Sequence, residues 1–167
     1  QQMTDRGDDP AELIRIYCGA IAEAISERPD SMTVTVHMCR GNSRSSWIAE
    51  GGYELVAEDM FAGVPVDGFF MEWDTDRAGG FEPLRFAPRD KMVVLGLVSS
   101  KIGELETKDD LKRRIDEASK YVPLDNLCIS PQCGFASVVA GNILSEDDQW
   151  RKLTLLAELA EEIWGSV

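Results

Sequence analysis

Four side chains that suit a zinc ion are spread through the sequence. The single histidine, His37, stands two residues before Cys39 in "VHMC", Glu72 lies in "GFFMEWD", and Cys133 lies in "SPQCGF". One imidazole, two thiols and one carboxylate form a donor set that suits tetrahedral zinc. Residues two apart in an extended segment point to the same side, so His37 and Cys39 can bind one ion.

Glu72 is the member whose surroundings most need an explanation. It interrupts an apolar stretch, and a carboxylate in such a place needs a cation, a metal or hydrogen bonds to offset the loss of water. Other members have simpler alternatives. A lone histidine is often a polar residue with satisfied hydrogen bonds, and Cys133 can be a small buried side chain. We favour a shared metal because all four residues fall at or just beyond the ends of predicted strands.

Apolar stretches rich in β-branched or aromatic residues predict strands at 32 to 38, 68 to 73, 92 to 98 and 127 to 130. Amphipathic stretches predict helices at 46 to 62, 107 to 121 and 145 to 164, and a further helix begins at Asp9 and Pro10 and ends before Pro29. Thr107 and Ser145 precede acidic residues and fit helix N-caps.

Two segments predict loops. The segment 74 to 90 shows no periodicity and is expected to form a functional loop with at most a short helix. The segment 41 to 46, "GNSRSS", is either a loop or a small anion-binding turn. We favour the loop because the segment lacks the glycine spacing of a P-loop.

Strands that alternate with helices predict one α/β domain over residues 1–167 with a parallel sheet. The carboxyl ends of parallel strands share one edge, where such proteins carry their chemistry. The candidates at that edge are, in strand order, His37 and Cys39, then Glu72 with Trp73 beside it, then Ser99, Ser100 and Lys101, then Cys133. Four strands form either a small open sheet or half of a (β/α)₈ barrel, because a closed barrel typically needs about 250 residues.

The composition excludes several classes of function. The 167 residues carry a formal charge of −13, which would repel nucleic acid and anionic lipid. No apolar run approaches the ~20 residues that span a bilayer, so we expect a cytoplasmic protein without membrane contact. Cys18 in a helix and Cys128 in a strand are expected to be core thiols, neither disulfide-bonded nor metal-bound.

Three motifs resemble those of one known family. They are "VHMCRGN" (36 to 42), "VDGFFMEWD" (66 to 74) and "LCISPQCGFAS" (127 to 137), in this order along the chain. The sequence is similar to the cobalamin-independent methionine synthases, and "FEPLRF" resembles their shorter single-barrel relatives most. The resemblance implies the carboxy-terminal half of a TIM (β/α)₈ barrel, made of four βα units with a preceding helix.

The resemblance also implies an activity. Zinc held by His37, Cys39, Glu72 and Cys133 would activate the thiol of homocysteine, which takes a methyl group from a methylated folate to give methionine. Glu72, the hardest donor of the set, is expected to leave the zinc ion when the substrate sulfur binds.

Two features depart from the family pattern. The family's proton-transfer histidine has no counterpart in "LVSSKIGE" (97 to 104), so Ser99, Ser100 or Lys101 would serve instead. The acidic residue that holds the substrate's amino group would lie upstream of Gln1. We therefore expect four more strands, from the same chain or a companion fragment, to complete the barrel. Trp73 is the aromatic residue expected to face the site and contact a bound cofactor.

Two other functions fit the same residues. One is a zinc-dependent alkyltransferase that uses another thiol or another methyl donor. The other is a zinc site without catalysis, in a half-barrel that binds a partner. A change in the ligand sphere of the metal when a thiol is added would separate the enzymes from the structural site.

Overall fold

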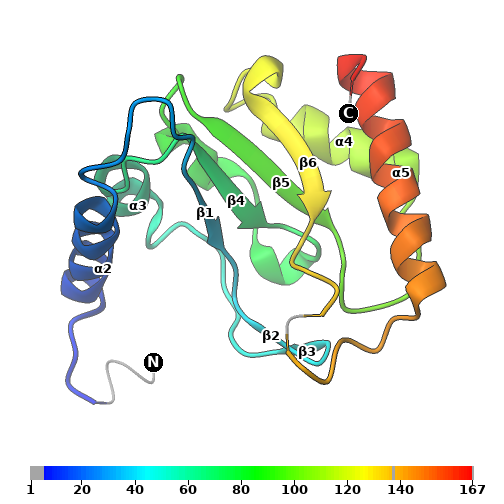
Figure 1. The fold of residues 1–167 in the computed structure, drawn as a ribbon, viewed down its shortest axis with the longest axis horizontal. Coiled ribbons are helices and arrows are strands. Elements are labelled where there is room, and N and C mark those ends of the chain that lie inside the picture. The colour runs from blue at the N-terminus through cyan, green and yellow to red at the C-terminus, as the bar shows by residue number, and fades with distance from the viewer. Residues whose placement is uncertain (1–5, 137, 167) are drawn as a thin grey trace.

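Four parallel strands form the centre of the protein in the computed structural model, which describes residues 6–136 and 138–166. The strands are β1 (Thr35–Met38), β4 (Gly68–Glu72), β5 (Met92–Val98) and β6 (Leu127–Pro131), and they lie side by side in the order β1-β4-β5-β6 (Figure 1). The prediction of an α/β fold with a parallel sheet is confirmed. The third predicted strand matches β5 residue for residue, and the other three differ from their predicted bounds by one to three residues.

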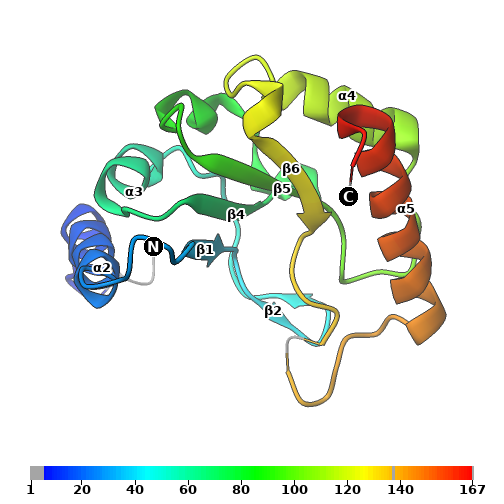
Figure 2. The same cartoon turned by 45° about the horizontal axis from the view of Figure 1, so that its top comes forward.

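The helices are α2 (Pro10–Ala24), α3 (Ala57–Gly63), α4 (Lys108–Ala118) and α5 (Glu146–Trp164). The predicted caps are confirmed: Asp9 accepts a hydrogen bond from the backbone of Ala11, Thr107 accepts one from Asp110, and Ser145 forms a capping box with Asp148. Figure 2 shows the strands as a curved row with α3, α4 and α5 on its outer side. None of the helices in the described part of the chain has the length and apolar character needed to cross a membrane.

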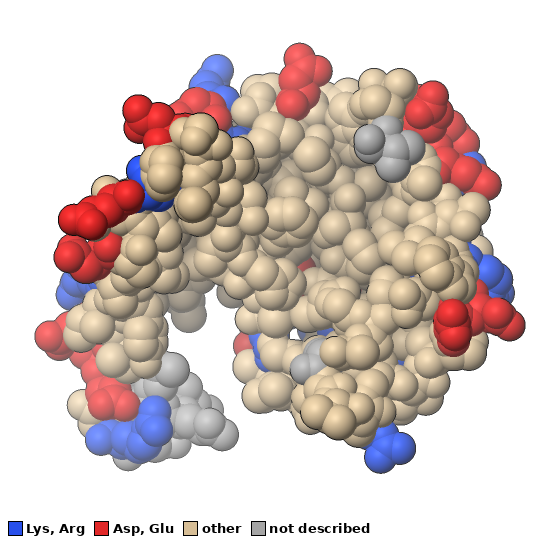
Figure 3. All heavy atoms as spheres, viewed as in Figure 1, with Lys and Arg blue, Asp and Glu red and all other residues tan. Residues whose placement is uncertain are grey.

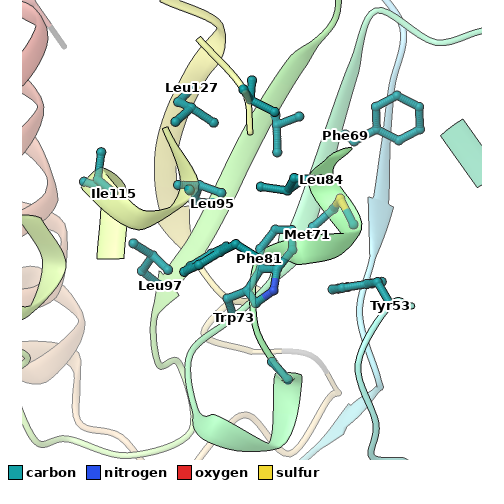
Figure 4. Packing of buried hydrophobic residues seen from close by; sticks show 14 of the residues in the cluster. Tyr53, Phe69, Met71, Trp73, Phe81, Leu84, Leu95, Leu97, Ile115 and Leu127 are labelled. Atoms are coloured by element: carbon teal, nitrogen blue, oxygen red, sulfur yellow. The ribbon is translucent and has the colours of Figure 1, made fainter. Parts of the chain in front are cut away.

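The two faces of the sheet differ in how well they are covered. Phe69, Met71 and Leu95 have at most 1% of their surface exposed and pack in the core on the helix side (Figure 4). The alternate residues face the other way, and one row of partners across the strands is His37, Phe70, Val94 and Cys128. His37 is exposed, and Phe70 and Cys128 are only half-buried. Cys128 is thus not the core thiol that its strand position suggested, whereas Cys18 is buried; both thiols are free.

The predicted helix at 46 to 62 is wrong over most of its length. The segment begins in a hairpin of β2 (Asn42–Ser43) and β3 (Ser46–Trp47), and only α3 is helical. Arg44 and Ser45 have φ of 50° and 66°, the left-handed conformation that a tight two-residue hairpin requires. The expected loop at 74 to 90 contains two short 3₁₀ helices, η1 (Asp76–Ala78) and η2 (Glu82–Phe86), and a third, η3 (Leu124–Asn126), precedes β6.

Candidate metal centre

Three of the four predicted ligands come together at the carboxyl edge of the sheet. The ligand atoms of His37, Cys39 and Cys133 all lie within 4.8 Å of one another, and the Cys133 Sγ is 3.5 Å from the His37 Nε2. His37 lies on β1 and Cys133 follows β6, so the group joins the two outermost strands. Three strand spacings in a flat sheet would separate these strands by about 14 Å. Curvature of the sheet and the loops beyond it therefore bring the ligands together.

The residues of this group fit a zinc ion. Bonds of about 2.3 Å to sulfur and 2.0 Å to nitrogen in tetrahedral geometry place neighbouring donors about 3.5 to 3.8 Å apart. The distance from Cys133 to His37 already falls in this range. Two N–H groups also point at the sulfurs: the Gln132 side chain donates to Cys133 at 2.6 Å, and the backbone of Gly41 donates to Cys39 at 3.4 Å. Such outer contacts orient metal ligands.

The pKa shifts in the group favour uncharged side chains when no ion is bound. Burial and the neighbouring Cys39 raise the pKa of the Cys133 thiol to about 12. Partial loss of hydration also lowers the pKa of the His37 imidazole, although part of the side chain stays exposed, and this favours the neutral ring that can coordinate a metal. Without a cation, Cys133 is thus a protonated thiol at neutral pH. A divalent ion at this point would favour the thiolate that serves as a ligand.

Glu72 lies at the same edge but bonds to cations of the chain. Its side chain is fully buried, and its Oε1 accepts from the Lys101 Nζ at 3.1 Å. Its Oε2 accepts from the backbone N–H of Arg40 at 2.7 Å and from the guanidinium of Arg40 at 3.3 Å. The expectation that this buried carboxylate needs a positive partner is met by Arg40 and Lys101. Its role as the fourth zinc ligand stays a prediction.

The three predicted catalytic residues after β5 have different surroundings. Lys101 contacts Glu72 directly, whereas the hydroxyl of Ser99 donates to Asp74 at 2.9 Å. The hydroxyl of Ser100 donates to the side-chain oxygen of Gln132 at 3.0 Å. Because Gln132 in turn donates to Cys133, Ser100 is linked to the metal group through one intervening side chain. In the described part of the chain, the contacts of Ser99 lead instead to Asp74, to Glu106 and to the backbone of Lys101.

Trp73 does not lie where the sequence suggested. Its side chain has no exposed surface and packs against Tyr53 and Phe81 in the helix-side core (Figure 4). The alternation of side chains places Trp73 on the face opposite Glu72. The indole N–H is already used, since it donates to the carbonyl of Gly80 at 3.1 Å. Trp73 is therefore not placed to contact a cofactor at the metal group.

Sequence reasoning missed several residues that build the site. The Tyr53 hydroxyl donates to the carbonyl of Met38 and accepts from the backbone N–H of Glu72, both at 2.7 Å, which ties β1 to β4. The guanidinium of Arg40 donates to the carbonyl of Glu72 at 3.1 Å and lies 4.3 Å from the centre of the Tyr53 ring. The position of Arg40 directly after Cys39 was an available signal. Tyr53, in an irregular loop, had none.

Comparisons place the chain among longer proteins. No family model matches it. The uncharacterised protein YxjG of Bacillus subtilis strain 168 is 54% identical over 165 residues, which is 98% of this chain and 44% of YxjG. YxjH of the same strain, also uncharacterised, is 52% identical over 159 residues, or 95% of this chain and 42% of YxjH. The chain spans less than half the length of these relatives.

Two solved structures share the fold. One, from Listeria monocytogenes and provisionally named a vitamin-B12-independent methionine synthase, has a TM-score of 0.75 and 40% identity, covering 96% of this chain and 44% of that one. The other is a B12-independent methionine synthase from Shewanella sp. W3-18-1 in complex with selenomethionine, with a TM-score of 0.67 and 20% identity over 91% of this chain and 46% of that one. The second likeness shows the fold alone.

The parallel sheet and its His-Cys-Cys group thus define an α/β protein with a candidate metal centre at the carboxyl edge of the strands. The Listeria structure confirms the resemblance to the cobalamin-independent methionine synthase family that the three sequence motifs indicated, and the Shewanella structure shows the same fold.

Proposed function

We propose that this chain carries the zinc site of a methyltransferase that moves a methyl group from a methylated folate to the thiol of homocysteine, giving methionine. The observation that carries this proposal is the group of His37, Cys39 and Cys133, whose donor atoms lie within 4.8 Å of one another. The name of the Listeria structure supports the class of reaction.

In this proposal, His37, Cys39, Cys133 and Glu72 hold the ion. Bound zinc would keep a substrate thiol in its thiolate form at neutral pH while leaving the sulfur able to attack. Two thiolates and one carboxylate outweigh the charge of the ion, and this donor set favours an electron-rich sulfur over activation of water. For the proton transfer, the candidates remain Ser99, Ser100 and Lys101.

The proposal also includes a partner, namely further strands that complete the barrel. Each outer strand of the four-stranded sheet pairs on one side only among the described residues, and such an edge is a template for pairing. A cleft of about 570 Å³ lies beside β1, lined by Tyr17, Ile21 and Met38, and one of about 480 Å³ lies beside β6, lined by Leu127 and Leu153. Figure 3 shows charged side chains around the rim of the molecule and few over its middle.

Zinc-dependent binding of L-homocysteine to the chain tests the proposed function. Calorimetric titration of the zinc-loaded protein is expected to show binding of L-homocysteine and none of L-homoserine, which differs only in having oxygen in place of sulfur. Metal-free protein is the control and is expected to bind neither. Equal binding of both compounds, or binding of homocysteine without zinc, would overturn the proposal. Methionine formation from 5-methyltetrahydrofolate is then measured after the companion strands are supplied.

A further inference from the structure

Lys101 is a buried cation held between two buried carboxylates. Its ammonium group lies 3.1 Å from the Glu72 Oε1 and 3.4 Å from the Asp74 Oδ2. The lysine side chain is 2% exposed and both carboxylate side chains are fully buried. The ring of Trp47, from the β2–β3 hairpin, lies over the ammonium at 4.3 Å. A buried charge is costly unless it is paired, so this arrangement fixes the ammonium in place.

Both carboxylate oxygens of Glu72 accept hydrogen bonds from other residues of the chain. Lys101 satisfies one oxygen, and the backbone and guanidinium of Arg40 satisfy the other. With donors on both oxygens, the buried Glu72 carboxylate is paired in the arrangement that the structure shows. A carboxylate that alternates between a metal and another position needs cationic partners at the second position, because a buried charge without a partner is strongly unfavourable.

We propose that Lys101 is a positioning residue that holds the Glu72 carboxylate whenever that carboxylate is not bound to zinc. The inference rests on the proposed function, in which His37, Cys39, Cys133 and Glu72 bind the ion. Asp74 is the second carboxylate that this role of Lys101 requires. Because Asp74 contacts the same ammonium, Lys101 keeps a negative partner when Glu72 turns to the metal. Lys101 and zinc thus compete for one carboxylate, and this competition makes Glu72 the ligand that a substrate thiol can displace.

Zinc affinity of single and double variants tests this competition. Removing the ammonium in Lys101→Met is expected to strengthen zinc binding by about 10-fold, a size typical of changes beside metal ligands. Lys101→Arg keeps the charge and is expected to restore the wild-type affinity. In Glu72→Gln protein there is no carboxylate to compete for, so Lys101→Met should change the affinity by much less than in the wild type. Competition with a chromophoric chelator measures all four variants.

A further variant tests the same competition and is expected to change the zinc affinity in the opposite direction. Asp74→Asn leaves Lys101 with Glu72 as its one carboxylate partner among the described residues, so zinc binding is expected to weaken. Lys152→Met is the matched control, because Lys152 is also fully buried but pairs with Glu106. This control is expected to lower the stability and leave zinc affinity unchanged. The visible spectrum of the cobalt-substituted proteins provides a readout of the ligand set that does not depend on activity.

The outcomes separate the two proposals. If Glu72→Gln leaves zinc affinity and the cobalt spectrum unchanged, Glu72 is not a ligand, and both the proposed ligand set and the role of Lys101 fail. If Glu72→Gln weakens zinc binding but Lys101→Met has the same effect with and without the Glu72 carboxylate, the charge of Lys101 acts on the zinc ion directly. It then does not act by holding Glu72. In that case the positioning role fails while the proposed function stands. Should Lys101→Met not fold, a stronger or unchanged zinc affinity in Asp74→Asn would overturn the inference.

Discussion

At the scale of single residues, Cys133 is the proposed ligand whose loss of a proton depends most on a bound cation. We predict that Cys133→Ser lowers zinc affinity by more than the ~10–100-fold typical of changes outside the ligand set. Cys128→Ser is the matched control, because Cys128 is a half-buried free thiol that lies outside the His-Cys-Cys group. Metal analysis and chelator competition check both variants. Full zinc occupancy and unchanged affinity in Cys133→Ser would refute the proposed ligand set.

The pKa of Cys133 also predicts how zinc binding depends on pH. Because this pKa is raised to about 12, Cys133 must release a proton when it becomes a zinc-bound thiolate. The pKa of His37 is lowered by desolvation, which favours the neutral ring before zinc binds. Between about pH 6 and about pH 8, the apparent zinc affinity should therefore rise at least about tenfold per pH unit. An affinity that is flat over this interval would show that no thiol loses its proton on binding.

The alternation of side chains along a strand explains which site residues could be predicted from the sequence. His37, Cys39 and Cys133 stand at or just beyond strand ends, and parallel pairing brings strand ends to one edge regardless of the loops between them. Trp73 was misplaced because a single step along the chain turns a side chain to the other face of the sheet. Tyr53 was missed because its contact with the Glu72 backbone arises from the path of an irregular loop.

At the scale of elements, the strands and capped helices were predictable and the hairpin was not. The strand β5 has the continuous apolar sequence of a strand buried in a parallel sheet, and Ser145 starts α5 as its cap requires. The segment 46 to 62 has spacing that fits a helix. Arg44 and Ser45 have positive φ and form a hairpin turn instead. The residues that follow this turn pair as β3, so the predicted helix does not start at residue 46.

Gly96 in β5 is required by the close approach of its neighbours. A Cβ at this position would lie 2.7 Å from the carbonyl oxygen of Met71 and 3.0 Å from the Cα of Gln132, both backbone atoms. Gly96→Ala is expected to lower the free energy of unfolding by about 1–3 kcal/mol, as overpacking typically does. Gly134→Ala is the control, because a Cβ there meets nothing within 4 Å. Denaturant unfolding compares them, and equal stability of the two variants would contradict the packing described for β5.

The ion pair of Arg28 and Asp67 joins the segment before β1 to the start of β4. The Arg28 guanidinium and the backbone N–H of Val34 lower the pKa of Asp67 to about 2. A lowered pKa stabilises the fold above the unfolded-state value of about 3.9, and this contribution is lost as the pH falls towards about 2. The stability difference between the wild type and Asp67→Asn should therefore be largest near neutral pH and shrink over that acid range. A difference independent of pH would show that the ion pair does not contribute.

At the scale of the whole molecule, the open edges of the sheet predict how the chain behaves alone. The strands β1 and β6 each have an unpaired side in the described structure, next to an apolar cleft. We expect these open edges to make the 167-residue chain self-associate. Analytical ultracentrifugation and thermal unfolding check this. A monomeric, cooperatively folded and catalytically competent chain would show that no companion strands are needed.

X-ray absorption of the zinc-loaded protein tests most directly whether the site binds zinc through thiolates and exchanges Glu72 for a substrate thiol. Before substrate is added, we predict two sulfurs at about 2.3 Å, with nitrogen and oxygen at about 2.0–2.2 Å. After L-homocysteine is added, we predict a third sulfur and the loss of one oxygen, because the thiol replaces the carboxylate of Glu72. A sulfur count that stays at two with saturating homocysteine, or zinc without sulfur ligands, would contradict the proposed zinc site and its exchange of Glu72 for the substrate thiol.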